Sequence, residues 1–247
     1  MSTASFLIVA NWKMQLSFDQ SLQFCRDNFT ALTTIGAHAP IVICPTTPAL
    51  YPIAQLFNTT CVTVGAQNCA TLQSGAFTGE VSALSLAQAG ARYCIVGHSE
   101  RRNIYHESSH DVAGKVEQLL NHKVCPIICI GETQQEHQRD QALHVLGEQL
   151  KPIFDLVAAN LTEICIAYEP VWSIGTGITA NMDYLSRLFT WLSAECAKQG
   201  VRARLLYGGS VNENNARELA TIKEISGFLI GGASLEFQKL QKIVSCI

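Results

Sequence analysis

The sequence predicts an α/β protein that folds as a single (β/α)8 barrel, and three observations lead to this prediction. Short apolar runs alternate with amphipathic stretches along the whole chain, which is typical of βαβ units and a parallel sheet. About eight such runs are present, and they are nearly continuous in apolar character, as strands buried on both faces are. The chain has 247 residues, and (β/α)8 barrels commonly fill about 250 residues as one domain.

The expected strands span residues 6–10, 41–44, 61–65, 93–96, 126–130, 164–168, 204–207 and 228–230. Between them, three stretches place apolar side chains on one face of a helix, and these span residues 18–32, 111–120 and 183–197. No linker, low-complexity segment or shift in composition divides the chain. We therefore expect residues 1–247 to form one domain.

An open, doubly wound sheet is the alternative architecture. Such a sheet predicts a glycine fingerprint directly after the first strand. Here Ala10 is followed by Asn11, Trp12 and Lys13, so the barrel is favoured.

Composition excludes several classes of partner. The net charge is −3 at pH 7 and no basic run exceeds Arg101-Arg102, so we expect no nucleic-acid partner. The longest N-terminal apolar run, residues 6–10, is too short for a signal or membrane segment, so we expect no membrane partner. The 10 cysteines form no CxxC pair, which favours free thiols in a reducing cytoplasm and argues against a metal site.

Polar or glycine-rich clusters follow most of the expected strands. In a (β/α)8 barrel the carboxyl ends of the strands share one rim, where functional groups gather. The clusters are Asn11 and Lys13 after the first strand, Gly97 to Glu100 after the fourth, Gly131-Glu132 after the fifth, Glu169 after the sixth, Gly208 to Ser210 after the seventh, and Gly231 to Ala233 after the eighth.

This set of residues predicts chemistry on a small phosphorylated substrate. Glycines after the last two strands let backbone N–H groups approach an anion closely, and barrels often bind phosphate there. Lys13, His98 and Glu169 supply a positive charge, an acid and a base, which suits proton abstraction beside a carbonyl. Taken singly, each has a plainer interpretation as a surface lysine, a structural histidine or a helix-capping glutamate.

The stretch after the sixth expected strand is typical of a lid. Pro170 ends the strand, the bulky pair Val171 and Trp172 follows, and Gly175 and Gly177 lie close together beyond it. Closure of such a loop over Glu169 removes water from the carboxylate, which raises its pKa and makes it a stronger base. A buried turn without a lid function is the alternative.

Eight short motifs are spread along nearly the whole chain, and they are ANWKM (10–14), GAQN (65–68), GAFTGE (75–80), VGHSERR (96–102), CIGE (129–132), AYEPVWSIGTG (167–177), YGGSV (207–211) and GFLIGGASL (227–235). Through these motifs the chain resembles the triosephosphate isomerase family, whose members are TIM barrels. The resemblance implies interconversion of dihydroxyacetone phosphate and D-glyceraldehyde 3-phosphate through an enediolate, with no metal and no other cofactor.

The resemblance also implies roles for single residues. Glu169 matches the general base, His98 the electrophile that donates to the carbonyl oxygen, and Lys13 the cation beside the phosphate. Ser99 and Glu100 match supporting residues, and Ser99 is expected to open a helix whose N-terminus disfavours a charged His98. The residues that match the substrate-binding set are Asn11, Lys13, Gly175, Ser210, Gly231 and Gly232.

Two further groups follow from the same resemblance. The lid residues are Pro170, Val171, Trp172, Ser173, Ile174, Gly175 and Thr176, with Glu132 and Tyr168 as partners of Trp172. The implied homodimer interface contains Gln67, Thr78, Glu80 and Arg101, with Thr78 reaching toward the partner and Glu80 pairing with Arg101.

The chain departs from the family pattern at three places. Ser173 stands where the lid usually has Ala, and the stretch after Leu235 is shortened. Ser226 stands where the family commonly has an Asp facing the residue that matches Arg204, so we expect Glu224 or a neighbour to pair with that arginine.

Two other functions stay open at this point. A Schiff-base aldolase requires a lysine inside a barrel strand, and no expected strand contains one. A non-catalytic sugar-phosphate-binding protein on the same scaffold is the second alternative, since fold alone does not determine function.

Overall fold

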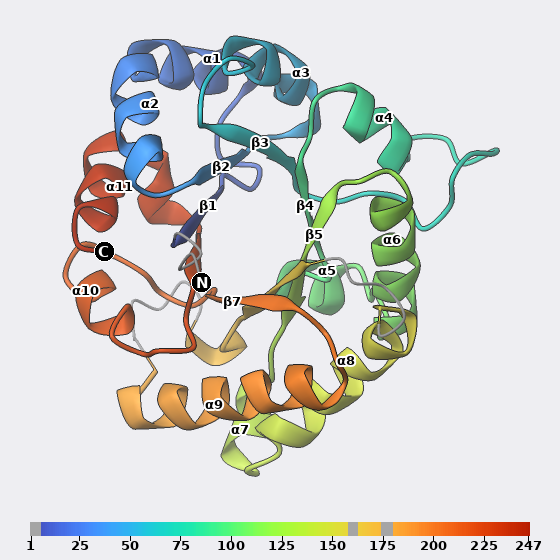
Figure 1. Ribbon diagram of the computed structural model, residues 1–247. Coiled ribbons are helices and arrows are strands. Elements are labelled where there is room, and N and C mark those ends of the chain that lie inside the picture. Colours follow the sequence, from blue (N-terminus) through green and yellow to red (C-terminus); the bar gives the residue numbers. More distant parts are fainter. Residues whose placement is uncertain (1–5, 158–162, 174–179) are drawn as a thin grey trace.

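In the computed structural model, which describes residues 6–157, 163–173 and 180–247, parallel strands close into a barrel in chain order, with β1 paired to β8 (Figure 1). This confirms the predicted (β/α)8 barrel. The strands are β1 (Leu7–Asn11), β2 (Ile41–Cys44), β3 (Thr63–Ala66), β4 (Tyr93–Val96), β5 (Cys125–Ile130), β6 (Ile164–Tyr168), β7 (Ala203–Tyr207) and β8 (Gly227–Ile230).

Helices surround the barrel on its outer face (Figure 1). They are α1 (Phe18–Asp27), α2 (Phe29–His38), α3 (Thr47–Leu56), α4 (Ala83–Gln88), α5 (Ser99–Ile104), α6 (Ser109–Asn121), α7 (Gln134–Gln138), α8 (Ala142–Val157), α9 (Met182–Lys198), α10 (Ala216–Leu219) and α11 (Phe237–Val244), with 3-10 turns η1 (Val171–Ser173) and η2 (Gly232–Leu235). The expected helices at 111–120 and 183–197 lie inside α6 and α9, and both are confirmed.

The single helix expected over residues 18–32 is wrong, because the chain breaks at Asn28 into α1 and α2. The Asn28 side-chain amide donates to the Phe24 carbonyl at 2.8 Å, and its backbone N–H donates to the same oxygen at 3.2 Å. An asparagine that bonds the preceding turn in this way competes with continuation of the helix. The apolar periodicity runs across the break, and so it does not reveal it.

Apolar side chains of the strands point alternately into the barrel and toward the helices. One buried cluster contains only strand residues and fills the barrel, with Leu7, Val42, Ile127 and Leu206 among its members. The second cluster joins the outward side chains of the strands to the helices. Burial on both faces explains why the sequence shows continuous apolar runs.

The cysteines of the chain are all free, as the sequence predicted. Several are fully buried, and burial raises the pKa of the Cys25 thiol to about 12, so this thiol stays protonated at neutral pH. Among the described helices, none is both long and apolar enough to cross a membrane.

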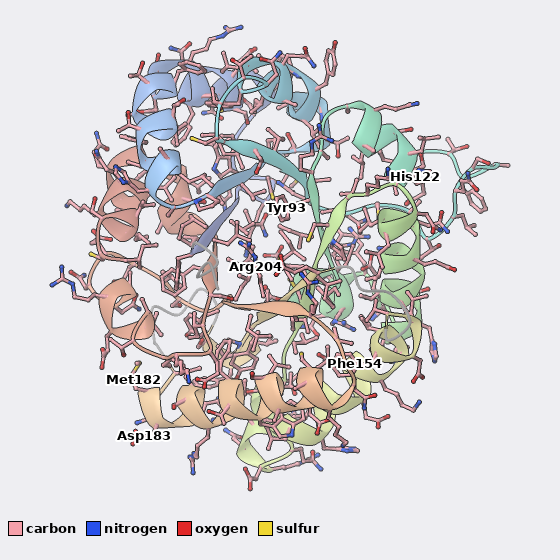
Figure 2. The ribbon with its side chains drawn as sticks, in the orientation of Figure 1. Tyr93, His122, Phe154, Met182, Asp183 and Arg204 are labelled. Atoms are coloured by element: carbon pink, nitrogen blue, oxygen red, sulfur yellow. The ribbon has the colours of Figure 1, made fainter. Side chains whose placement is uncertain are left out.

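The aspartate that Arg204 lacks at position 226 is replaced by a residue just before the neighbouring strand. Arg204 lies inside the ring of strands when the barrel is viewed along its axis (Figure 2), and its Nε lies 3.2 Å from Glu163 Oε2. Glu163 directly precedes β6. The partner of Arg204 is therefore Glu163, whereas we expected Glu224 or a neighbour. The Ser226 hydroxyl bonds the backbone of Leu205 instead, accepting its N–H at 3.1 Å.

We expect Gly227→Ala to lower the free energy of unfolding by about 1–3 kcal/mol, because an added Cβ overpacks the β1–β8 seam. It would lie 2.3 Å from the Leu7 carbonyl oxygen, which is a backbone atom that cannot rotate away. Urea denaturation at one protein concentration measures the loss. The matched control is Gly147→Ala on α8, where no atom lies within 4 Å of the added Cβ. This control should gain about 0.5–1 kcal/mol. Equal stabilities for the two variants would contradict the prediction.

Candidate active site

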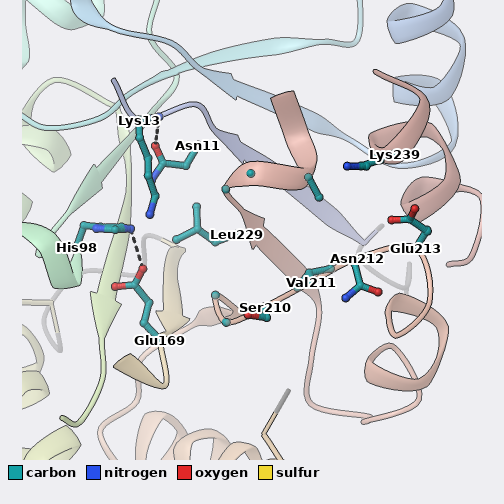
Figure 3. A pocket seen from close by; sticks show the side chains of 15 residues that line it. Asn11, Lys13, His98, Glu169, Ser210, Val211, Asn212, Glu213, Leu229 and Lys239 are labelled. Atoms are coloured by element: carbon teal, nitrogen blue, oxygen red, sulfur yellow. Dashed lines mark hydrogen bonds and ion pairs between the residues drawn. The ribbon is translucent and has the colours of Figure 1, made fainter. Parts of the chain in front are cut away.

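A cavity of about 410 Å³ opens at the carboxyl ends of the strands (Figure 3). It brings together seven of the predicted site residues from five different parts of the chain, and these are Asn11, Lys13, His98, Glu169, Ser210, Gly231 and Gly232. Gly175, which was predicted to bind substrate, lies outside the described residues, as do Ile174 and Thr176 of the predicted lid.

Glu169 is 2% exposed and sits at the end of β6, on the wall of the cavity. Its backbone N–H donates to the Ile130 carbonyl at 2.7 Å, which continues the β5–β6 ladder by one residue. Its carboxylate has two partners. Oε2 accepts the Ser99 N–H at 2.8 Å, and Oε1 lies 3.0 Å from His98 Nε2. Ser99 therefore supports the carboxylate through its backbone.

These contacts keep Glu169 ionised in this state. Burial raises the pKa of the carboxyl, but the charge and hydrogen bond of His98, the Ser99 N–H and the charge of Lys13 outweigh it, and the net pKa lies below the ordinary value. Burial likewise lowers the pKa of His98, whereas the carboxylates of Glu169 and Glu100 raise it above the ordinary value. The pair is thus a carboxylate held against an imidazole N–H.

The orientation of His98 follows from its place at the N-terminus of α5. Its Nδ1 accepts the backbone N–H of Glu100 at 3.2 Å, so the side chain caps the helix. A nitrogen that accepts such a bond carries no proton, and the proton of the neutral ring must then lie on Nε2. This tautomer presents an N–H donor to the cavity. The predicted helix start at Ser99 is confirmed.

Lys13 reaches the same cavity from the end of β1. Its Nζ lies 2.6 Å from Glu100 Oε1, and its backbone has a φ of 50°, which is rare for a residue with a side chain. Two amide side chains hold that backbone. Asn11 Oδ1 accepts the Lys13 N–H at 3.1 Å, and Gln67 Nε2 donates to the Lys13 carbonyl at 2.7 Å and to the Cys44 carbonyl at 3.0 Å. Sequence reasoning assigned Gln67 only to an interface and missed this support.

The glycines of the rim fall into two groups that differ in their surroundings. An added Cβ on Gly209 would lie 2.3 Å from the Tyr207 hydroxyl, so a side chain there would displace that ring, and one on Gly208 would lie 3.0 Å from Glu169 Cγ, a tight contact that the Glu169 side chain would have to accommodate. At Gly232 nothing lies within 4 Å, and at Gly231 the nearest atom is Lys13 Cε at 3.5 Å. Gly231 and Gly232 therefore border open space beside a cation, as an anion site requires.

A buried carboxylate, Glu132, holds the start of the predicted lid. Its Oε1 accepts the Trp172 Nε1–H at 2.7 Å, the Tyr168 hydroxyl at 3.0 Å and the Tyr184 hydroxyl at 3.1 Å. His137 stacks on the Trp172 ring with centroids 4.3 Å apart. Tyr184 and His137 were missed from the sequence, since neither stands in a motif next to the lid. Ser210 adds a bond to this segment by donating from its hydroxyl to the Ser173 carbonyl at 2.9 Å.

The predicted interface residues lie around a second cavity of about 510 Å³, whose lining includes Gln67, Glu80 and Arg101 as well as Lys13. Thr78 is exposed. The pairing of Glu80 with Arg101 that is expected at the dimer interface stays a prediction, and within the single chain Arg101 has another partner. The Arg101 guanidinium instead donates to Glu107, which also accepts from the buried Lys115. The Glu107 carboxylate is nearly buried between these two cations and forms an ion pair with each of them.

Within the part of the chain that the structure describes, no group of three or more His, Cys, Asp or Glu side chains is arranged to hold a metal ion.

Comparison with known proteins gives a consistent result. The family model described as triosephosphate isomerase matches residues 6–247. A triosephosphate isomerase of Vesicomyosocius okutanii is 38% identical over 242 residues, which cover 96% of this chain and 97% of the relative. One from Bacteroides fragilis is 37% identical over 243 residues, with 96% and 97% covered. One from Aquifex aeolicus is 38% identical over 242 residues, with 96% and 98% covered.

We expect Glu132→Gln to lower the free energy of unfolding by about 1–3 kcal/mol, because three donors lose a charged acceptor and a buried NH₂ group gains no partner. Urea denaturation at one protein concentration measures the loss. Glu148→Gln, an identical change at an exposed position of α8, is the control and should be close to neutral. If the two variants are equally stable, Glu132 does not hold the lid segment.

Proposed function

Because this chain belongs to the triosephosphate isomerase family, we propose that Glu169, His98 and Lys13 carry out its reaction in the cavity at the barrel rim. The reaction interconverts dihydroxyacetone phosphate and D-glyceraldehyde 3-phosphate, an isomerisation of glycolysis. The observation that carries the proposal is the Glu169–His98 pair, 3.0 Å apart and facing the same cavity as Lys13. A coupled assay that follows the isomerisation of glyceraldehyde 3-phosphate tests the activity.

In this mechanism Glu169 acts as the general base. Its carboxylate removes a proton from the carbon beside the carbonyl group of the bound triose phosphate, while the Nε2–H of His98 donates to the carbonyl oxygen. The product of this step is an enediolate. The hydroxyl proton of the enediolate passes from one oxygen to the other through His98 Nε2, and Glu169 returns its proton to the neighbouring carbon, so no electrons leave the substrate and no oxidant is consumed.

The phosphate end is held by charge and backbone. Lys13 supplies the cation, and Gly231, Gly232 and Ser210 offer the open, N–H-bearing rim beside it. Asn11 contributes through the Lys13 backbone, since its Oδ1 accepts the Lys13 N–H. Gly175 completes the proposed phosphate site, although it lies outside the described residues.

The lid is proposed to span Pro170 to Thr176, of which Pro170 to Ser173 is described. Closure excludes water from Glu169, which raises the pKa of the carboxyl and strengthens it as a base. It also protects the enediolate phosphate from loss of its phosphate group to water. Glu132 and its three donors hold the first part of the lid against the barrel.

We expect Glu169→Asp to lower kcat on the order of 100-fold, which equals about 2.7 kcal/mol of barrier. The change keeps the charge but withdraws the carboxylate by about 1 Å, the length lost with one methylene group. KM should change far less, because other residues hold the phosphate. Steady-state kinetics of the isomerisation, with circular dichroism as a folding check, measures both.

The control for this experiment is Glu148→Asp, the same shortening on the exposed face of α8, which should leave kcat unchanged. A helix-capping role for Glu169 predicts little loss in the Asp variant, because Asp is itself a preferred capping residue. A folded Glu169→Asp variant with near-normal turnover would therefore remove the general-base assignment.

The functional unit is proposed to be a homodimer. Met14 is 91% exposed and Tyr105 is 65% exposed, and both line the cavity next to Lys13. Phe77, in the exposed segment of residues 71–80, is also unusually open for an aromatic side chain. Exposed apolar side chains around a cavity favour a protein interface at that place. A segment of a second copy that docks into the cavity covers these side chains. Gln67, Thr78, Glu80 and Arg101 belong to the proposed contact.

We expect deletion of residues 73–78 to give a soluble monomer with poor activity, because the segment proposed to dock is removed while every catalytic residue remains. Analytical ultracentrifugation measures the assembly, and the coupled assay measures the activity. An intact dimer after the deletion would show that these residues do not hold the two copies together.

The domain organisation, the cofactor requirement and the cellular location of the enzyme are proposed as well. Residues 1–247 are proposed to act as one catalytic domain without a cofactor. The free thiols and the glycolytic reaction favour a cytoplasmic location, and participation in gluconeogenesis follows from the reversibility of the isomerisation.

A further inference from the structure

Gln149 makes two hydrogen bonds to a single residue at the edge of the active site. It lies on α8, a helix on the outside of the barrel (Figure 1), and Gly131 directly follows β5. Its Oε1 accepts the Gly131 N–H at 2.9 Å, and its Nε2 donates to the Gly131 carbonyl at 2.9 Å. Both main-chain polar groups of Gly131 are thus bonded by one rigid amide, which fixes the position and the rotation of this residue.

Gly131 in turn presses against the backbone of Glu169. A Cβ added to Gly131 would lie 1.8 Å from the Glu169 carbonyl oxygen and 3.3 Å from Val171 Cγ2. The two residues are therefore in direct contact, with no space between the end of β5 and the root of the lid. The Glu169 N–H also donates to the Ile130 carbonyl at 2.7 Å. This hydrogen bond likewise joins the end of β5 to the root of the lid.

The other side of Glu169 is equally confined. Gly208 lies against it, since an added Cβ there would be 3.0 Å from Glu169 Cγ. A small cavity of about 150 Å³ behind the base is lined by both Gln149 and Glu169. A displacement of Gly131 must therefore move the Glu169 main chain or open this cavity further.

We propose that Gln149 is a positioning residue for the reaction, which sets the place of the Glu169 carboxylate through Gly131. The proposal rests on the base role of Glu169 given above. Gln149 does not touch the substrate cavity and so does not contribute to binding. Glu132 follows Gly131 directly in the chain, so the same clamp also orients the carboxylate that holds Trp172.

A purely structural role for Gln149 makes a different prediction. Loss of two hydrogen bonds would then lower stability, while each folded molecule would turn over at the native rate. Positioning predicts a loss in kcat per folded molecule with KM preserved, because the phosphate contacts lie elsewhere on the rim.

The first test is Gln149→Met, which keeps the length of the side chain and removes both hydrogen bonds. We expect kcat to fall on the order of 10-fold and KM to stay within about twofold, because a fraction of an ångström at the base is already costly. Ile153→Val, which thins the packing of the same helix one turn later, is the control and should keep the native kcat. Native kcat in folded Gln149→Met would overturn the proposal.

A second variant, Gln149→Glu, keeps the proposal testable if Gln149→Met is unstable. Its carboxylate can accept the Gly131 N–H but cannot donate to the Gly131 carbonyl until it is protonated. The ratio of its kcat to the native kcat should therefore be low at about pH 8 and rise as the pH falls toward about 5, where a buried glutamic acid takes up its proton. A ratio that does not change with pH would count against positioning.

Glu169→Asp measured in the same series separates the two levels of the argument. If Glu169→Asp keeps native turnover, the base role itself fails and the positioning of Glu169 loses its purpose. If Glu169→Asp loses turnover but both Gln149 variants keep it at every pH, the base role stands and only the inference about Gln149 is overturned.

Discussion

Closure of the barrel between β1 and β8 is the constraint on which the rest of the structure depends. Ala10 pairs with Ile230 in this seam, so Asn11, which ends the first strand, and Lys13, which follows it, line the same cavity as Gly231 and Gly232, which follow the last strand. A sheet left open at this edge would place the two ends of the chain at opposite sides. The seam is tight at Gly227, where no side chain fits, and it thereby brings the cation to the phosphate rim.

Electrostatics then links the residues of the rim into one chain of contacts. Lys13 bonds Glu100, the Glu100 N–H bonds His98 Nδ1, and His98 Nε2 faces Glu169. Each charged group has an opposite or polar partner, and together these partners outweigh the desolvation that burial imposes on the Glu169 carboxylate. The same contacts hold the pKa of Glu169 low in this state. In the proposed mechanism, closure that removes water and shifts these partners makes this carboxylate a stronger base.

The root of the lid and the base share one support. Gly131 touches the Glu169 backbone, and Glu132 bonds Trp172, Tyr168 and Tyr184. Two consecutive residues after β5 thus contact both Glu169, the proposed base, and Trp172 of the proposed lid. Because helix α8 reaches them through Gln149, the outer layer of the barrel takes part in the geometry of the active site.

The barrel and the residues of its rim could be predicted from the sequence, because the burial of a strand and the polarity of its end are local properties of the chain. Lys13, His98 and Glu169 each follow a recognisable apolar run, and closure alone makes them converge. Contacts between side chains that are distant in sequence could not be predicted in this way. Glu163 replaces the expected partner of Arg204, Gln67 holds the Lys13 backbone, Tyr184 joins Glu132, and Gln149 clamps Gly131. These depend on the direction in which side chains leave neighbouring elements, which no spacing within a single segment encodes.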